Sequence, residues 1–90
     1  MDEGAILDQL EELARGFGIQ IRYEAMKQDD ESKKVAGGLC LLKGEYVLII
    51  NSNASGRDKI QTFAEALKHF NLDEVYIRPF LRELLDKVSI

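Results

Sequence analysis

The sequence predicts a small α+β protein in which three helices pack on a three-stranded, mainly antiparallel sheet, in the order α-β-β-β-α-α. Apolar residues recur at helical spacing near both ends of the chain and after residue 55. Apolar and polar residues alternate near residue 20, and a hairpin pattern spans residues 35–53. Because 90 residues leave no room for two hydrophobic cores, we expect one α+β domain, residues 1–90.

The composition argues against several classes of protein. Hydrophobic residues make up 46% and charged residues 31% of the chain, a balance typical of globular rather than disordered proteins. The net charge of −4 and the scattered basic residues disfavour nucleic-acid binding. A single cysteine, an acidic N-terminus without a signal-peptide pattern and the lack of a membrane-length apolar stretch favour a soluble cytoplasmic protein. We expect no bound cofactor and no membrane partner.

Residues 3–15 predict the first helix. Its apolar positions, which recur every three or four residues, are Ile6, Leu7, Leu10, Leu13, Ala14 and Phe17. Asp2 and Glu3 at its start complement the helix dipole. Gly16 or Gly18 ends the helix, because glycine accepts the left-handed backbone that a C-terminal cap needs.

The stretch 19–26 alternates apolar and polar side chains and predicts a half-buried strand. The residues that follow, 27–34, include no apolar side chain and predict a solvated loop or a hairpin tip. Asp29, Asp30 and Glu31 in this loop are also candidate cation ligands. Their spacing lacks the glycine and the distal glutamate of a calcium loop, which favours the solvated loop.

Residues 35–53 predict a β-hairpin whose turn is Lys43-Gly44, with the glycine supplying the positive φ angle that such a turn needs. The second arm, residues 46–50, is continuously apolar. Because a strand of this kind is covered on both faces, we expect it at the centre of the sheet.

The first arm of the hairpin contains two glycines and the single cysteine. Gly37 and Gly38 weaken the strand propensity and predict a bulge or a close approach of two backbone segments. Cys40 lies between Leu39 and Leu41, and no histidine or basic residue adjoins it. This pattern favours a small buried apolar residue over a reactive thiol.

A second helix is predicted after Ser55, a candidate N-cap with Asp58 in the position of a capping box. A strand that runs into such a helix start can also bind an anion with help from Arg57, but the glycine pattern of a phosphate loop is absent. A last helix begins at Pro79, because proline is favoured in the first helical position. Its apolar stripe consists of Phe80, Leu81, Leu84, Leu85 and Val88.

Glu65 and His69 are the candidate metal ligands of this chain. They stand four residues apart in the second helix, so that both side chains can reach one metal ion from one helix. They fall on the opposite side from the apolar stripe of this helix, so we do not expect the core to enclose them. This stripe consists of Ile60, Phe63, Ala64, Leu67 and Phe70. A third ligand would have to come from Asp73, Glu74 or another carboxylate.

The predicted hairpin ends in "IIN", and the second helix reads "TFAEALKHF". Residues 35–70 thereby resemble the core of ImmA/IrrE-type zinc peptidases, in which a strand ending in Ile-Asn precedes a helix of the kind T-x-A-H-E-L-G-H-F. The positions that match are Thr62, Ala64, Leu67, His69 and Phe70. Glu65 replaces the first histidine, and Ala66 replaces the glutamate that activates the zinc-bound water. The resemblance therefore implies a relative without peptidase activity. The whole chain also resembles small uncharacterised bacterial proteins with a "GGLC" strand and a helix of the "LxEAL" kind.

These observations predict a small, non-catalytic interaction module that self-associates, since no nucleophile–base pair, phosphate loop or complete metal set is visible. The alternatives are a protein that binds a metal or a small ligand through Glu65 and His69, and an enzyme with Cys40 or His69 in a pocket. Large apolar residues gather in the segment 75–88, and a patch of that size is rarely left exposed on a monomer. We therefore expect a homodimer through residues 75–88. The other arrangement is a terminal helix that folds back and completes the core of a monomer.

Overall fold

Three helices and three strands make up the part of the chain that the computed structural model describes, residues 2–25 and 37–88. In chain order they are α1 (Glu3–Gly16), β1 (Gln20–Glu24), β2 (Gly37–Leu42), β3 (Glu45–Asn51), α2 (Gly56–Leu67) and α3 (Pro79–Lys87). The predicted α+β class and the predicted order of the elements are confirmed. None of the three helices in these ranges is both long enough and apolar enough to cross a membrane.

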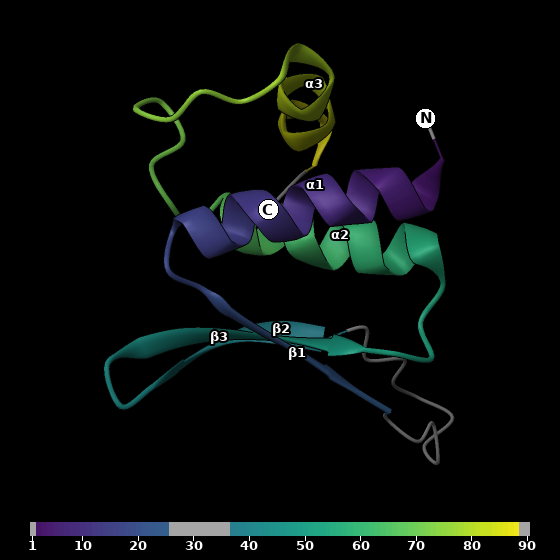
Figure 1. Ribbon diagram of the computed structural model, residues 1–90, viewed down its shortest axis with the longest axis vertical. Coiled ribbons are helices and arrows are strands. Elements are labelled where there is room, and N and C mark those ends of the chain that lie inside the picture. Colours follow the sequence, from purple (N-terminus) through teal and green to yellow (C-terminus); the bar gives the residue numbers. More distant parts are fainter. Residues whose placement is uncertain (1, 26–36, 89–90) are drawn as a thin grey trace.

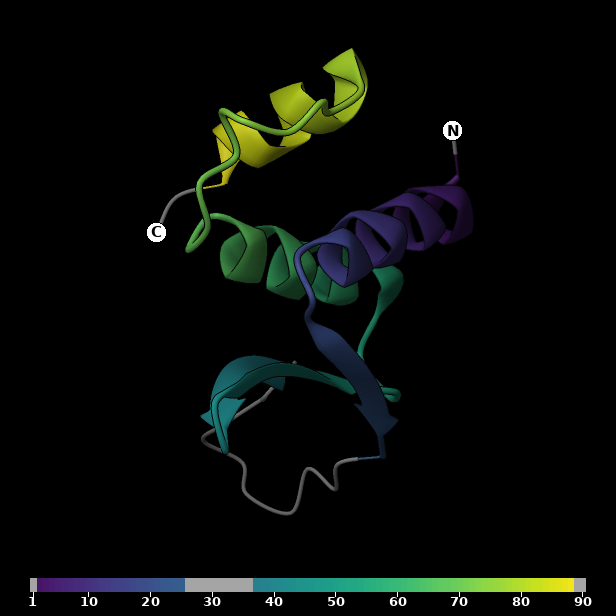
Figure 2. The same cartoon turned by 60° about the vertical axis from the view of Figure 1, so that its left-hand side comes forward.

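The elements form three layers, with the sheet on one side, α1 and α2 in the middle and α3 on the far side of this helix pair (Figures 1 and 2). α1 packs on β1, and α2 packs on β2 and β3. α1 and α2 contact each other, and α2 also contacts α3. The hydrophobic core therefore lies between the sheet and the helix pair and continues to α3.

The sheet is mixed, with the strand order β1-β3-β2. β3 lies in the centre, as its continuous apolar run predicts. β2 pairs with β3 in the antiparallel sense, whereas β1 pairs with β3 in the parallel sense. The expected antiparallel arrangement therefore holds for the hairpin alone, because β1 runs in the same direction as the strand beside it.

Glycine geometry shapes both ends of β2. Lys43 and Gly44 form the predicted turn to β3, and both have positive φ angles, 52° and 80°, as a two-residue type I′ turn requires. Gly37 has a φ angle of 141°, and a Cβ atom there would overlap the carbonyl group of Ile49. The predicted close approach of two backbone segments is thus confirmed at Gly37. At Gly38 a Cβ atom would meet nothing within 4 Å.

Side-chain caps fix where α1 and α2 begin. Asp2 accepts a hydrogen bond from the Ala5 amide at 2.7 Å, and Ser55 accepts one from the Asp58 amide at 3.1 Å, which confirms Ser55 as the N-cap of α2. Each bond satisfies an amide that has no partner within its helix. Gly18 follows α1 with a φ angle of 81°, so it supplies the left-handed residue at the end of that helix.

α3 folds back on the rest of the chain. Leu81, Leu85 and Val88 belong to the core cluster, and each is at most 8% exposed. Lys68 donates from Nζ to the Val88 carbonyl at 2.9 Å and so ties the end of α2 to the end of α3. The apolar stripe that predicts a homodimer through residues 75–88 is therefore largely covered within one chain. The homodimer itself stays a prediction.

The face of the sheet opposite the helix pair has no described helix over it (Figure 1). Leu48 and Ile50 point into the core, so the alternating residues Val47 and Ile49 lie on this second face. The apolar run of β3 predicts cover on both faces, but among the described residues the helices cover only one. Val47 is nevertheless only 5% exposed, whereas Ile49 is half-buried.

Candidate functional site

Glu65 lies within α2, whereas His69 lies just beyond it, and the metal site that the sequence predicts from this pair stays a prediction. α2 ends at Leu67, and His69 lies beyond that end. The His69 amide donates to the Ala66 carbonyl at 3.1 Å, so the chain tightens after Leu67 instead of continuing as an α-helix. Glu65 is half-buried and accepts a hydrogen bond from Gln61 at 2.8 Å, whereas His69 is exposed.

No third ligand joins Glu65 and His69 in the described part of the chain. This part contains no group of three His, Cys, Asp or Glu side chains that could hold a metal ion, so Asp73 and Glu74 do not complete the predicted site. Ala66, which the predicted resemblance to zinc peptidases matches to their catalytic glutamate, is 3% exposed and belongs to the core cluster. Among the described residues, no full set of metal ligands lies at this point, and Ala66 cannot accept a proton.

A shallow depression of about 140 Å³ lies where α2 faces β2. Its lining includes Gly37, Gly38, Leu39, Glu65, Ala66 and His69. The sequence shows a single apolar stripe on the second helix and therefore predicts that Glu65 and His69 lie on the opposite side of this helix, away from the hydrophobic core. In the structure α2 is buried on several sides, since it contacts α1, α3 and the sheet, and Glu65 and His69 come to lie next to β2.

In the described part of the chain, the edge of β2 next to this depression has no partner strand, and we call it the free edge. Among the described strands, β2 pairs with β3 alone. Leu42 and Glu45 flank the two-residue turn and form a hydrogen-bonded pair, and such pairs alternate along an antiparallel ladder. The backbone groups of Gly37, Leu39 and Leu41 are therefore the ones that point toward the free edge.

The two edges of the sheet differ in charge. β2 carries no charged side chain from Gly37 to Leu42. β1 forms the other edge and carries Arg22 and Glu24, whose side chains form an ion pair at 3.0 Å. Charged side chains on an edge strand hinder the addition of a further strand, so β1 is protected in this way and β2 is not.

Two leucines at the hairpin end of β2 are exposed to solvent. Leu41 is 61% exposed and Leu42 is 49% exposed. They point to opposite faces of the sheet, as neighbours in a strand do. The sequence indicates this surface in part, because the run "GGLCLL" has no charged residue. That this run lies at an edge of the sheet follows only from the order of the strands.

The remaining candidate residues from the sequence are Cys40 and the acidic residues of the loop 27–34. Cys40 is a free thiol in β2, and it is half-buried rather than buried as its neighbours in the sequence predict. It lies outside the core cluster, on the face of the sheet opposite the helices. Asp29, Asp30 and Glu31 lie outside the described residues.

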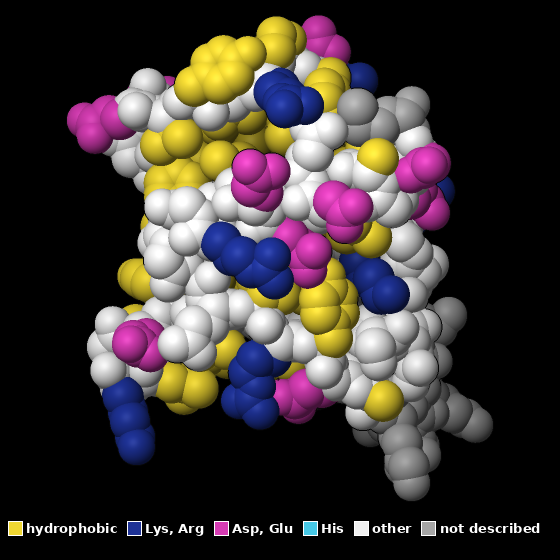
Figure 3. All heavy atoms as spheres, viewed as in Figure 1, with side chains coloured by type: hydrophobic (Ala, Val, Ile, Leu, Met, Phe, Trp, Pro, Cys, Tyr) yellow, Lys and Arg dark blue, Asp and Glu magenta, His cyan; other side chains and the backbone are white. Residues whose placement is uncertain are grey.

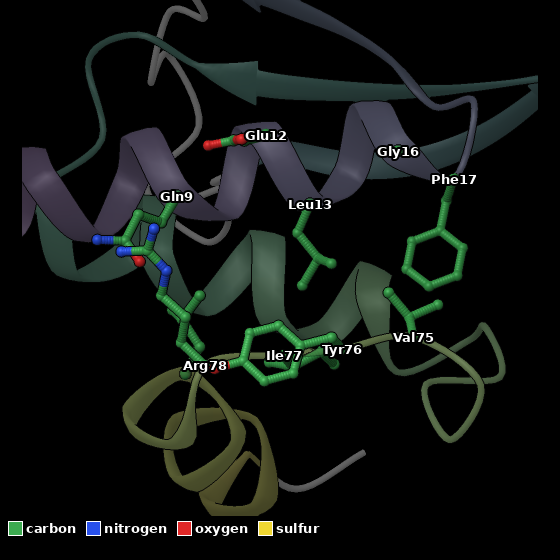
Figure 4. Close-up of a pocket in the computed structure, with 10 residues that line it drawn as sticks. Gln9, Glu12, Leu13, Gly16, Phe17, Val75, Tyr76, Ile77 and Arg78 are labelled. Carbon is green, nitrogen blue, oxygen red and sulfur yellow. The ribbon is translucent and has the colours of Figure 1, made fainter.

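A larger groove of about 380 Å³ lies between α1 and the segment that precedes α3 (Figure 4). Leu13 of α1 and Phe17, which directly follows this helix, line one side, and Val75 and Ile77 line it from that segment. Arg78 lies at one end of the groove (Figure 4). In the space-filling view, apolar side chains gather in the hollow between α1 and α3 (Figure 3).

Comparisons with protein-family models, with curated proteins and with solved structures give no match to this chain. The resemblance of residues 35–70 to zinc peptidases stays a prediction.

Proposed function

We propose that the protein is a non-catalytic interaction module that self-associates, and that the free edge of β2 is the surface through which it does so. The observation that carries this proposal is the contrast between the two edges of the sheet. β1 is protected by the ion pair of Arg22 and Glu24, whereas β2 has no charge and ends in two exposed leucines.

A strand added to β2 makes two kinds of favourable contact. Its backbone exchanges hydrogen bonds with the amide and carbonyl groups of Leu39 and Leu41. It also covers the exposed side chains of Leu41 and Leu42, and burying one leucine side chain fully contributes about 1.5–3 kcal/mol. The net charge of −4 opposes the approach of two copies, but an uncharged edge adds no further repulsion at the point of contact.

Matched substitutions of two exposed hydrophobic residues test this proposal. Leu41→Lys places a charge on the β2 edge, and Tyr76→Lys places one in the segment 75–88, where Tyr76 is 82% exposed. In light scattering, the unaltered protein at high concentration should have a mass near twice 10.2 kDa. Leu41→Lys should lower the mass to about 10.2 kDa, and Tyr76→Lys should leave the dimer intact.

Two outcomes of this experiment count against the proposal. A mass near 10.2 kDa at every concentration up to about one millimolar contradicts self-association. Dissociation by Tyr76→Lys but not by Leu41→Lys places the interface in the segment 75–88 instead of β2. Far-UV circular dichroism of both variants is the control for folding, which neither substitution should disturb because both side chains are exposed.

We infer a second candidate function, the binding of a small apolar ligand that carries a carboxylate, from the groove beside α1. Its volume of about 380 Å³ falls within the range of ligand pockets, roughly 300–1,000 Å³. Leu13, Phe17 and Ile77 supply apolar walls, and Arg78 at one end offers a guanidinium group to a carboxylate. Arg78 forms no ion pair with any residue in the described ranges.

Thermal unfolding in the presence of decanoate tests this second candidate, because a ligand that binds only the native state raises Tm. Decanoate should raise the Tm of the unaltered protein, and Arg78→Gln should abolish the rise. Arg22→Gln, which removes a cation from the sheet, is the matched control and should keep it. No rise, or the same rise in Arg78→Gln, contradicts the assignment.

A further inference from the structure

We propose that the strand that pairs with β2 is the β2 strand of a second copy, antiparallel to the first, with a two-fold axis that passes beside Leu39. This inference rests on the proposed self-association through the β2 edge and specifies its geometry. A two-fold axis perpendicular to the sheet gives both copies the same patch and joins the two sheets into one. It also keeps both helix pairs on the same face of the joined sheet.

β2 is self-complementary in shape, with a hollow near one end and a projection at the other. Gly37 and Gly38 have no side chains, and they line the depression of about 140 Å³ beneath α2. Leu41 projects from the other end and is 61% exposed. Because antiparallel pairing brings opposite ends of the two strands together, Leu41 of each copy lies at the hollow of the other.

Leu41 projects from the same face of the sheet as the hollow. Leu39 packs against the core cluster, so it faces the helices, and so does Leu41 two positions along the strand. Leu41 also pairs with Tyr46, whose ring contacts Phe70 on the helix side at a centroid distance of 5.0 Å. The side chain of Leu41 from a second copy therefore approaches the depression from the side on which α2 lies.

The alternation of backbone groups determines the register. Only Gly37, Leu39 and Leu41 direct their amide and carbonyl groups to the free edge, so hydrogen-bonded pairs across the axis must join residues of this set. With Leu39 opposite Leu39, Leu41 lies opposite Gly37, and all three positions take part. A cavity of about 150 Å³ holds benzene, which is similar in size to a leucine side chain, so a depression of about 140 Å³ is large enough.

This arrangement gives Glu65 and His69 a place at the edge of the interface. Both line the depression, so their polar side chains surround the point where Leu41 of the second copy enters. A polar rim around an apolar contact is the usual composition of a protein interface.

Cysteine cross-linking tests the register, because each register places a different pair of positions face to face. With Leu39 on the axis, Cys40 lies opposite Gly38 of the second copy in a non-hydrogen-bonded pair, with Cα atoms about 4.5 Å apart, a distance that allows a disulfide. Gly38→Cys adds a side chain where a Cβ atom meets nothing within 4 Å. This variant should therefore form a covalent dimer under mild oxidation. The two cysteines cannot bridge within one strand, because the side chains of positions i and i+2 point in parallel and their Cβ atoms lie about 6.6 Å apart, whereas a disulfide needs about 3.5–4.5 Å.

Two control proteins report the neighbouring registers. The unaltered protein has Cys40 alone, which faces itself only if the axis passes beside Cys40. The double variant Gly38→Cys, Cys40→Ser has a cysteine at position 38 alone, which faces itself only if the axis passes beside that position. A covalent dimer that forms faster in either control than in Gly38→Cys overturns the proposed register.

The remaining outcomes separate this inference from the proposed function. If none of the three proteins cross-links but light scattering shows a dimer that Leu41→Lys dissociates, the antiparallel pairing is wrong and the proposed function stands. A monomer in all measurements overturns both.

Amide hydrogen exchange of Leu39 gives a second readout that needs no cysteine. In the proposed dimer this amide bonds across the axis, so it should exchange at least about tenfold more slowly than in the Leu41→Lys variant. The Cys40 amide bonds to β3 and should exchange at a similar rate in both proteins. Equal exchange of the Leu39 amide in the dimer and in the variant contradicts the pairing.

Discussion

Gly37 is the residue of β2 that least tolerates a side chain. Its φ angle of 141° is one that residues with a Cβ atom rarely adopt, and the Ile49 backbone lies against it. Gly38, the next residue, has free space around it. The neighbouring glycines therefore form a matched pair in which only one is required by the fold.

We predict that Gly37→Ala lowers the free energy of unfolding by about 1–3 kcal/mol, from backbone strain and the contact with Ile49. Gly38→Ala should change it by about 0.5 kcal/mol or less. Urea denaturation of both variants at low protein concentration measures the difference. Equal losses would mean that the two glycines have the same role in the strand.

Tyr23 joins β1 to α1 through its hydroxyl group, which donates to Glu11 Oε1 at 2.6 Å. Desolvation by partial burial, and then the hydrogen bond to this carboxylate, raise the pKa of Tyr23 above its ordinary value of 10.0. The folded state thus favours the neutral phenol. The contribution of this group to stability is fully present below the ordinary pKa and is lost as the pH rises through the higher pKa of the folded state.

We predict two effects of Tyr23→Phe on stability. At pH 7 the free energy of unfolding should fall by about 0.5–1.5 kcal/mol, because the hydrogen bond to Glu11 is lost. As the pH rises above about 10, the variant should lose less stability than the unaltered protein, because the group that titrates is gone. Denaturation at a series of alkaline pH values measures both effects. Tyr76→Phe, at a position that is 82% exposed, is the control and should behave like the unaltered protein.

At the scale of elements, β3 is the strand on which the fold depends most. It pairs with both other strands, and its residues Leu48 and Ile50 are fully buried beneath the helices. Its other face carries Val47 and Ile49, over which no described helix lies. The two faces of this one strand should therefore differ in how much they contribute to stability.

We predict that Leu48→Ala lowers the free energy of unfolding by about 2–5 kcal/mol, as expected for a leucine in a packed core. Ile49→Ala should cost about 1 kcal/mol, because the Ile49 side chain is only half-buried. Chemical denaturation of the two variants gives the comparison. A loss at Ile49 as large as that at Leu48 would show that the second face is covered as closely as the first.

α2 illustrates why burial of an element is hard to foresee from its own residues. Its sequence shows one apolar stripe, which predicts that Glu65 lies on the side away from the core. In the structure α2 contacts α1, α3 and the sheet, and Thr62 and Ala66 are buried beside the stripe. Small residues such as Ala66 give little hydrophobic signal but allow a neighbouring element to approach closely.

At the scale of the whole molecule, stability and association are linked. A chain of 90 residues buries a modest fraction of its surface, so contacts with a second copy, as proposed, would add substantially to its stability. If two copies pair along β2, dimer formation stabilises the folded state by mass action, and Tm depends on protein concentration.

We predict that the Tm of the unaltered protein rises as its concentration increases from about 10 μM to about 1 mM, the weak end of the affinity scale. The Tm of Leu41→Lys should stay constant over the same range, because a lysine on the β2 edge prevents pairing. Differential scanning calorimetry measures both. A concentration-independent Tm for the unaltered protein would contradict a dimer that dissociates in this range.

The sequence by itself determined the features that depend on neighbours a few residues apart. The cap at Ser55, the turn at Lys43-Gly44 and the central position of the apolar strand follow from local backbone preferences and from the spacing of apolar residues. The number, type and order of the elements follow from the same signals.

Only the tertiary structure decided which segments far apart in the sequence lie together. β1 lies beside β3 and not beside β2, which makes the sheet mixed and leaves β2 with an edge that no other described strand covers. α3 folds back over the helix pair, and His69 falls beyond the end of α2. These outcomes depend on which apolar faces pack against one another. The apolar face of a single helix or strand could be buried against more than one partner, so the choice is made only when the whole core assembles.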